Sequence, residues 1–450
     1  MFNKIFFIFL LIIISSIFIF LAIKSLLFSL IFVVVLAVVL VFYQKPEIGI
    51  YLIIISILGG QLLKINFETG DSGLLISDIL IPFFLLIWIL RLVIRKEKIP
   101  STLIGPPLFL FLSLAILSLL NGLRFFELNQ IIISSFYLIR LLSYGLLFFV
   151  SATIFSRNER GIYWLKNIMI ASFSLFAIIG IFQLIYFPDL SNWAYKFGWD
   201  PHIGRLFSTF LDPNFAGAFL TVGFIISLAL IFYTKSIEGR IILSVTAILT
   251  LVSTILTYSR STYLFLFISF FIFSIIKSRK LLLLGIAVLI ILLLIFPRSL
   301  ERIQGGFDID ESAKARFESW GNTITIIRDH PLLGVGYNSF RYAQNDYGFG
   351  DKSSISRAGA GSDSSMLLIF ATTGIFGLLS YLVFYFSALI KTKKVFTYSN
   401  SPQKRAFALA LFSILIGLIF HSVFVNSLFY PALMIPIFII LGLISSKTNN

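Results

Sequence analysis

Long apolar segments recur along almost the whole chain, and short polar stretches separate them. Each segment runs for about 17 to 25 residues, the length that an α-helix needs to cross a bilayer core of ~30 Å. A β-barrel would show short alternating strands instead. The pattern predicts fourteen helices, at residues 5–23, 26–43, 47–63, 74–95, 104–121, 131–155, 162–187, 215–233, 239–257, 262–277, 281–296, 366–390, 405–427 and 431–445.

One polar segment is much longer than the others and divides the chain into three parts. Residues 1–296 form an N-terminal transmembrane bundle of about eleven predicted helices, 297–365 form a large loop, and 366–450 hold the last helices. Four apolar residues of the loop recur at spacings of three or four: Phe317, Trp320, Ile324 and Ile327. This spacing predicts an amphipathic helix that ends before Pro331 and lies against the outer mouth of the bundle.

The composition agrees with a membrane protein, because 58% of the 450 residues are hydrophobic, only 12% are charged and the mean hydropathy is +1.01. The fold class expected is therefore an all-α integral membrane protein with about 12–14 transmembrane helices and one large external loop. The chain has no cysteine and three histidines, which excludes disulfides and thiolate metal sites and disfavours a histidine-rich metal centre. We expect no metal and no cofactor.

The basic residues indicate the orientation in the membrane, since Lys and Arg concentrate in loops that stay in the cytoplasm. With a cytoplasmic N-terminus, eighteen basic and four acidic residues fall in cytoplasmic segments, which accounts for nearly all of the net charge of +15. The segment 297–365 is then external, with eight basic and nine acidic residues, and both termini are cytoplasmic. The net positive charge is therefore explained by the topology of a multi-pass protein of the cytoplasmic (inner) membrane. It does not imply a nucleic-acid partner.

Three external arginines beside predicted helix ends are candidates for binding an anion: Arg205, Arg260 and Arg316. A guanidinium offers a planar fork of donors that suits phosphate or diphosphate, and a lipid-borne substrate presents its headgroup at this depth. Asn214 and His202 lie near Arg205 in the sequence and are supporting candidates, as is Arg140. The alternative is that such arginines bind the phosphates of ordinary membrane lipids.

Two charged residues fall within predicted helices, Arg140 near the middle of 131–155 and Asp78 within 74–95. Intramembrane charges are costly, so they mark either an internal path or an ion pair between helices. His421, in the predicted helix 405–427, is expected to hydrogen-bond to a neighbouring helix.

His330 and Asp363 are the candidates for proton transfer. His330 opens the sequence HPLLGVG, whose two glycines predict a tight turn, so it is either a turn residue or a catalyst. Asp363 lies where the loop re-enters the membrane, and it either caps the next helix or acts as a general base towards a hydroxyl.

Four sequences in order, RLFSTFLDPNFAGAFL, LTYSRS, ARFESWGNTITIIRDHPLLGVGYNSF and SDSSMLLIFATTGIFG, resemble the bacterial O-antigen ligase and polymerase family. The resemblance covers residues 200–390 by motif and the rest by topology, and it implies a fold like that of C-type membrane glycosyltransferases. It implies glycosyl transfer from an undecaprenyl-diphosphate-linked oligosaccharide on the outer face of the cytoplasmic membrane, with neither metal nor nucleotide sugar.

Residue by residue, Arg205 and Arg260 match family arginines that engage the diphosphate, and Arg316 matches an arginine of the loop. Where the ligases have His followed by Asn, this chain has Asp363 followed by Ser364, which favours the polymerase branch. The expected partners are the lipid-linked oligosaccharide, membrane lipid, and a chain-length regulator and flippase of the same pathway. The alternatives are a ligase acting on a lipid core or protein, and a lipid-linked oligosaccharide flippase or other transporter, although the two halves of the chain do not look alike as transporter repeats often do.

Overall fold

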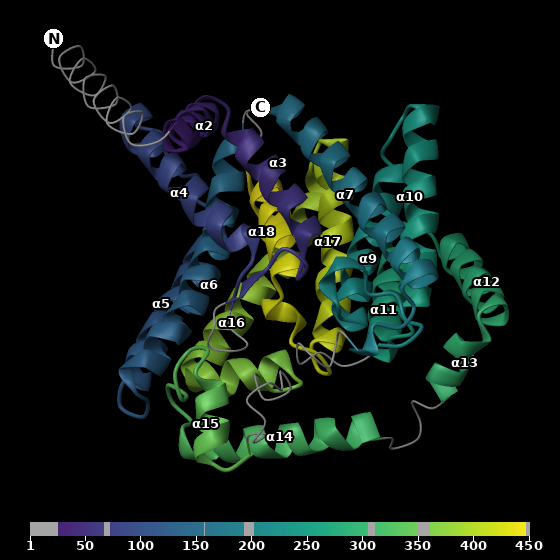
Figure 1. The fold of residues 1–450 in the computed structure, drawn as a ribbon. Helices are drawn as coiled ribbons and strands as arrows, with labels where there is room; N and C mark the ends of the chain where they lie inside the picture. The colour runs from purple at the N-terminus through teal and green to yellow at the C-terminus, as the bar shows by residue number, and fades with distance from the viewer. Residues whose placement is uncertain are drawn as a thin grey trace, which may run out of the picture.

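The computed structural model describes residues 26–66, 73–156, 158–192, 202–304, 311–349 and 361–446. The described part is a helical bundle, with one short antiparallel pair of strands, β1 (Ile65–Asn66) and β2 (Gly73–Leu74). Figure 1 shows α13, α14 and α15 at one end of the bundle and the C-terminus at the other. The end that carries α13 to α15 is called the loop end below.

Among the described residues, nine helices are long and apolar enough to cross a membrane, which confirms an all-α, multi-pass membrane protein. These nine are α4 (Ile76–Arg95), α5 (Gly105–Gly122), α6 (Leu128–Ile154), α7 (Glu159–Tyr186), α9 (Pro213–Ile231), α10 (Ile237–Leu256), α11 (Arg260–Lys277), α16 (Ser365–Tyr398) and α17 (Pro402–His421). The apolar helices α12 (Arg279–Ile295) and α18 (Pro431–Ser445) are shorter.

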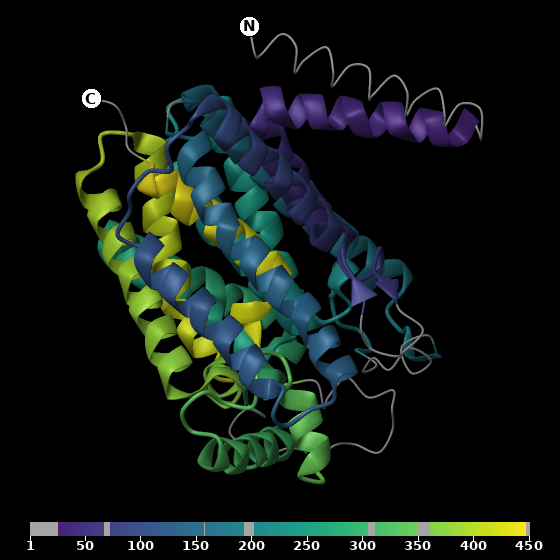
Figure 2. The same ribbon diagram turned by 90° about the vertical axis from the view of Figure 1, so that its left-hand side faces the viewer.

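The N-terminal region differs from the sequence prediction. Residues 5–23 lie outside the described residues. Helices α2 (Leu26–Gln44) and α3 (Pro46–Ser56), expected as two separate spans, meet at a bend of 115° and together count as at most one. Proline lacks the backbone N–H that would continue α2, so Pro46 begins a new helix instead. Figure 2 shows α2 lying across the end of the bundle opposite the loop end.

The core of the bundle consists of α9, α17 and α18. Small residues allow α9 to approach its neighbours closely: a Cβ on Gly217 would lie 2.5 Å from Thr262 of α11, and one on Gly223 would lie 2.7 Å from Phe173 of α7. In a membrane, such close approach replaces the hydrophobic effect as the source of helix association. All fifteen residues of α18 are buried, so its neighbours cover it on every side.

The predicted amphipathic helix is present as α14 (Glu311–Asp329), and Figure 1 shows it lying across the loop end. The face that packs agrees with the predicted one only in part. Ile327 is buried and Trp320 packs on Phe424, with ring centroids 6.0 Å apart, but Phe317 and Ile324 are 55% and 41% exposed. Thr323 and Ile326 are buried instead, and Ile326 and Ile327 pack together with Val335 and Ala371 of α16.

The sequence HPLLGVG forms the predicted tight turn, and the turn packs into a break in α16. Gly334 and Gly336 have φ of 68° and 112°, and Gly374, inside α16, has φ 67° and ψ −171°. The break frees backbone groups of α16, and the turn pairs with them: Val335 N–H donates to Ala371 O (2.9 Å), Gly336 N–H to Thr372 O (3.1 Å), and Ile375 N–H to Pro331 O (2.8 Å). A broken helix in a membrane persists only where neighbours satisfy such groups.

Candidate functional site

The segment RLFSTFLDPN folds as a short loop that ends in a helix start. Its Leu206 N–H donates to Leu256 O at the end of α10 (3.0 Å), and Ser208–Phe210 form one 3₁₀ turn. Asp212 caps α9, because its carboxylate accepts hydrogen bonds from the backbone N–H groups of Asn214 (2.7 Å) and Phe215 (3.2 Å). The loop therefore holds Arg205 against the loop ends of α10 and α11.

Arg205 is one of three arginines that come together there. Its Nε donates to Thr257 O (2.9 Å). The other two lie on the short helix α13 (Pro297–Gln304): Arg298 donates to Gly204 O (2.8 Å), and Arg302 donates through Nε to Tyr258 O (3.3 Å). We call Arg205, Arg298 and Arg302 the arginine cluster.

The cluster concentrates positive charge in a partly buried place. The pKa of Arg205 is lowered to about 10, chiefly by burial and then by the charges of Arg302 and Arg298, while Asp212 opposes the shift. Arg205 still carries its proton at neutral pH, but burial and the neighbouring positive charges make its charged form less favourable than it is in water. Bound anions would relieve that cost, so the cluster is suited to phosphate or diphosphate.

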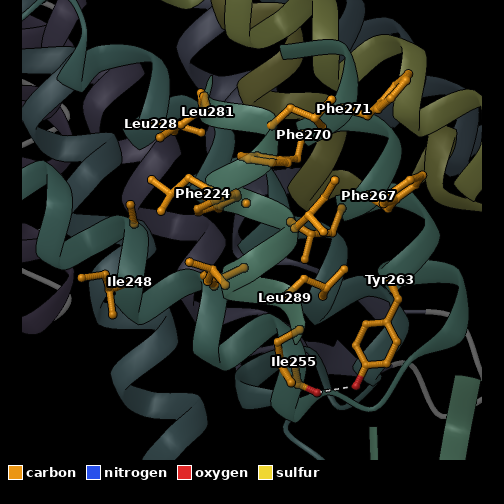
Figure 3. Close-up of a pocket in the computed structure, with 18 of the residues that line it drawn as sticks. Phe224, Leu228, Ile248, Ile255, Tyr263, Phe267, Phe270, Phe271, Leu281 and Leu289 are labelled. Atoms are coloured by element: carbon orange, nitrogen blue, oxygen red, sulfur yellow. Dashed lines mark hydrogen bonds between the residues drawn. The ribbon is translucent and has the colours of Figure 1, made fainter. Parts of the chain in front are cut away.

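An apolar groove of about 670 Å³ begins beside this cluster and runs between α9, α10, α11 and α12. Figure 3 shows its walls, which include Phe224, Phe267, Phe270 and Leu289. At one end it is lined by Arg260, the first residue of α11, and by Tyr263. The Tyr263 hydroxyl donates to Ile255 O (2.6 Å) and lies 3.2 Å from the hydroxyl of Ser299, a residue of α13. Tyr263 and Ser299 therefore form a shared boundary, because Tyr263 lines the groove and Ser299 belongs to α13, the helix that carries two arginines of the cluster.

Asn214 connects the start of α9 to the start of α11. Its side-chain oxygen accepts a hydrogen bond from the Ser259 hydroxyl (2.6 Å), and its backbone carbonyl accepts one from Thr262 (3.3 Å). His202 is half-buried beside the same loop, and its carbonyl accepts the Arg205 N–H (3.2 Å). Asn214 and His202, two of the three supporting candidates, are therefore next to the arginine cluster.

Arg316 and Asp363 form a second group, on α14 and at the start of α16. The Asp363 N–H donates to the hydroxyl of Ser319 (3.3 Å), and Ser319 lies one turn after Arg316 on α14. Residues three apart share one face of a helix, so Arg316 and Asp363 are close to each other. Arg316 also acts electrostatically on His421 at the end of α17. The structure thus places Arg316 in this second group, beside Ser319 and Asp363, and Arg205 in the arginine cluster.

His330 lies apart from both groups. It follows α14, about 20 Å along the helix from Arg316 at ~1.5 Å per residue. Its ring packs edge-on against Phe125, in the turn between α5 and α6, with ring centroids 4.6 Å apart.

Arg140 forms the interhelical ion pair that was one of the two expectations for it. Its guanidinium donates to both carboxylate oxygens of Asp78 (2.8 and 2.5 Å), and the Tyr144 hydroxyl donates to Asp78 as well (2.6 Å). Asp78 is in the first turn of α4 and not in the middle of a span, so it also accepts the Leu75 N–H and caps that helix. Arg140 additionally lines a cavity of about 310 Å³ between α6, α9, α16 and α18, which is called the central pocket below.

His421 does not behave as the sequence predicted. It is fully buried, and neither ring nitrogen has a hydrogen-bond partner among the described residues. Its ring packs on Phe265 instead, with centroids 5.5 Å apart. Within the described residues, no group of three or more His, Asp or Glu side chains is placed to hold a metal ion.

Sequence reasoning missed Arg298 and Arg302. They enter the sequence analysis only through the charge balance of residues 297–365, because no helix is predicted directly after 281–296. The available signal was their spacing of four residues in PRSLER, which places both on one face if the segment is helical.

The fold and the arginine cluster define a multi-pass membrane protein with three arginines gathered at the edge of an apolar groove. Residues 245–382, about a third of the chain, match a family described as O-antigen ligase. The match confirms the resemblance to the O-antigen ligase and polymerase family and supports a glycosyl-transfer activity of that type in polysaccharide biosynthesis. It includes Arg260, both α13 arginines, Arg316, His330 and Asp363, whereas Arg205 and Asn214 precede it. No curated protein matches the chain in a sequence comparison.

Proposed function

We propose that the protein polymerises undecaprenyl-diphosphate-linked oligosaccharide repeat units into O-antigen, capsule or exopolysaccharide. The observation that carries the proposal is the shared boundary of the arginine cluster and the apolar groove. A lipid diphosphate has the same two parts, a long hydrocarbon chain and a doubly phosphorylated head. The groove takes the chain, and the cluster with Arg260 takes the diphosphate.

The reaction is an inverting substitution at the anomeric carbon of the donor sugar. The oxygen of an acceptor hydroxyl forms a bond to that carbon, and the bond from carbon to the diphosphate oxygen breaks. Undecaprenyl diphosphate leaves with the electron pair, so negative charge grows on it. Arginines already in position stabilise that charge without reorganising, which is the largest single contribution in many enzymes.

The proton of the acceptor hydroxyl goes to Asp363. We assign this role to Asp363 and not to His330 because His330 follows the far end of α14 and packs on Phe125, whereas Asp363 lies beside the turn of α14 that carries Arg316 and Ser319. Gly361, two residues before Asp363, is so close to Asn426 that a Cβ there would lie 2.7 Å from its side-chain nitrogen. Asn426 in turn lines the central pocket, which reaches Phe215, the neighbour of Asn214 at the start of α9. Asp363 and the proposed diphosphate site are thus each connected to the central pocket through a nearby residue, Asn426 and Phe215 respectively.

The loop end faces the outside of the cytoplasmic membrane in this proposal. The distribution of basic residues supports that orientation, since the short loops expected outside hold few of them. The same site would serve a ligase, and only the acceptor distinguishes the two activities. The sequence Asp363–Ser364 supports the polymerase, and the family match supports an enzyme over a flippase.

The test compares two arginine variants in purified protein supplied with lipid-linked repeat units. Arg205→Ala and Arg302→Ala should each slow glycan lengthening by about 10²–10³-fold, the usual cost of removing one such stabilising group. Arg260→Ala should abolish the long glycan ladder in cells. Arg240→Ala, at the opposite end of α10, removes the same side chain away from the site and should have no effect.

Protein levels and thermal stability of all variants are measured alongside. A normal rate of glycan lengthening in both Arg205→Ala and Arg302→Ala would contradict the assignment of the diphosphate site. If the protein moves the lipid-linked unit across vesicle membranes without any lengthening, it is a flippase or other transporter. If it transfers glycan only onto a lipid core or a protein, it is a ligase.

A further inference from the structure

The central pocket differs from the groove because its walls combine aromatic rings with amide groups. Its described lining includes six aromatic side chains, which belong to Tyr137, Phe215, Tyr337, Phe340, Phe429 and Tyr430. Three amide side chains also line it, those of Gln61, Asn338 and Asn426. The volume of about 310 Å³ is at the lower end of the ~300–1,000 Å³ that is usual for ligand sites, so the pocket suits a small polar molecule.

The aromatic side chains give the pocket flat surfaces that neighbouring rings hold in place. Tyr430 stacks face to face on Phe215, with ring centroids 3.9 Å apart, and packs edge-on against Phe210 at 5.4 Å. Tyr337 packs edge-on against Phe429 at 6.1 Å. A sugar ring has an apolar face of C–H groups and a polar rim of hydroxyl groups. Tyrosine rings, which are apolar but carry a polar tip, are suited to both.

The two basic side chains of the lining already interact within the chain. The Arg140 guanidinium donates to both carboxylate oxygens of Asp78 and lies 4.8 Å from the centre of the Tyr137 ring. Lys64 has an interaction of its own as well. A carboxylate that entered the pocket would therefore lose hydration without meeting an unpaired cation, which is a cost that a neutral hydroxyl group does not have.

The amide groups offer an uncharged ligand what the basic residues do not. Each side-chain amide carries both a donor and an acceptor, as a sugar hydroxyl group does, so the two kinds of group can pair in either direction. The described lining contains neither Asp nor Glu, so a positively charged amino sugar finds no ion-pair partner there. The described walls thus favour a ligand that has hydroxyl or acetamido groups and no net charge.

The position of the pocket connects it to the proposed reaction. Phe215 follows Asn214, whose side-chain oxygen accepts a hydrogen bond from Ser259, the residue before Arg260. A Cβ on Gly361, two residues before Asp363, would lie 2.7 Å from the side-chain nitrogen of Asn426. A sugar in the pocket would therefore be next to residues that contact the proposed diphosphate site and the segment of the proposed general base, as an acceptor requires.

We propose that the central pocket binds an uncharged hexose or N-acetylhexosamine unit of the acceptor glycan, with its ring against the aromatic side chains and its hydroxyl groups on the amides. The inference rests on the proposed function, and it deepens that function by giving the acceptor a chemical class. The protein then selects against a uronic acid at this position, because the carboxylate is desolvated without compensation.

The experiment measures binding and needs no turnover. Full-length protein in phosphatidylcholine nanodiscs is titrated with two trisaccharides that differ only in their terminal sugar, which is glucose in one and glucuronic acid in the other. The neutral trisaccharide should bind about tenfold more tightly, a modest part of the cost of desolvating an unpaired charge. The comparison on the unmodified protein decides the inference even if a variant does not fold.

A charge added to the pocket tests the cause of the preference. Gln61→Lys places a further ammonium group in the lining and should remove or reverse the preference for the neutral sugar. The matched control is Asn345→Lys, at an exposed position on α15 (Phe340–Asp346) outside the lining, and it should keep the preference.

The role of the aromatic walls is tested by removing one ring. Tyr137→Leu should weaken the binding of the neutral trisaccharide about threefold to tenfold, the range expected for losing one aromatic contact. Tyr163→Leu, at a 48% exposed position on α7, is the matched control and should leave the affinity unchanged.

Equal affinity for the two trisaccharides, tighter binding of the acidic one, or absence of binding by both would overturn the inference. A preference that Gln61→Lys leaves unchanged, or that Asn345→Lys removes equally, would do so as well. Glycan lengthening is assayed separately on the same preparations. Protein that prefers the neutral sugar but never lengthens glycan rejects the proposed polymerase and keeps the pocket, whereas lengthening without any preference does the reverse.

Discussion

At the scale of single residues, the tertiary contacts divide the candidates by role. Arg205 joins two arginines from a helix about ninety positions later in the chain, and this convergence places positive charge where one arginine alone would bind ordinary lipid phosphate. Asp363 lies beside Ser319 and one helical turn from Arg316, whereas His330 packs on Phe125. These contacts support Asp363 over His330 in the proton transfer proposed above.

The role of Asp363 is tested by removing its basicity at constant size. Asp363→Asn should lower kcat for glycan lengthening by about 10²–10⁴-fold, the usual contribution of a general base, and leave the KM of the donor nearly unchanged. Asp346→Asn, on the short helix α15 (Phe340–Asp346), is the matched control, and His330→Gln should retain activity. Near-normal kcat in Asp363→Asn, or a comparable loss in His330→Gln, would contradict the assignment.

At the scale of elements, the break in α16 is what brings the long loop onto the bundle. The turn 331–336 supplies the partners for the backbone groups that the break exposes, and Ser118 of α5 donates to Thr372 O at the same place (2.5 Å). The break therefore positions the start of α16, which includes the approach to Asp363. Gly374 is the residue that permits it, since its φ and ψ are almost confined to glycine.

Replacing Gly374 should destabilise the protein. A Cβ there would lie 2.1 Å from Leu332 O, and the backbone strain alone amounts to about 1–3 kcal/mol. Gly374→Ala should lower the thermal unfolding midpoint in detergent. The matched control is Gly321→Ala, in the exposed middle of α14, where a Cβ meets nothing within 4 Å and alanine favours the helix. A midpoint for Gly374→Ala equal to that of the unmodified protein would show that the break is not needed.

At the scale of the whole molecule, two cavities and a group of side chains lie near one another at the loop end. They are the groove between α9 and α12, the central pocket and the arginine cluster. The start of α9 lies between them, held by Asp212 and Asn214. A hydrocarbon chain, a diphosphate and a sugar would therefore occupy adjacent places along one path. This arrangement supports the proposed transfer of glycan from a lipid carrier.

Filling the groove should affect only donors with a long hydrocarbon chain. Leu251→Trp narrows the groove and should raise the KM for an undecaprenyl-linked donor about tenfold, for the loss of roughly two buried methylene groups. A donor with the same sugars and diphosphate on a short prenyl chain should be unaffected. Leu117→Trp, at a 52% exposed position on α5, is the control. Equal effects on the two donors would place the hydrocarbon chain elsewhere.

The sequence by itself determined the parts of this protein that depend on local pattern. Apolar length predicted the transmembrane helices from α4 onward, the glycines of HPLLGVG predicted a tight turn, and the spacing of apolar residues predicted α14. These features follow from the cost of exposing backbone groups to lipid and from allowed dihedral angles, which act within one segment. The same local pattern could not indicate that α2 and α3 meet at a sharp bend or which face of α14 is buried.

Only the tertiary structure decided which distant residues meet. The joining of Arg205 with Arg298 and Arg302, the pairing of Arg140 with Asp78, and the central pocket with Lys64 all depend on how helices pack. A membrane helix shows similar hydrophobicity around its circumference, because lipid and neighbouring helices are both apolar. The sequence of such a helix therefore predicts that it crosses the membrane but gives little information about which helices it contacts. The candidate site is formed by those contacts between helices.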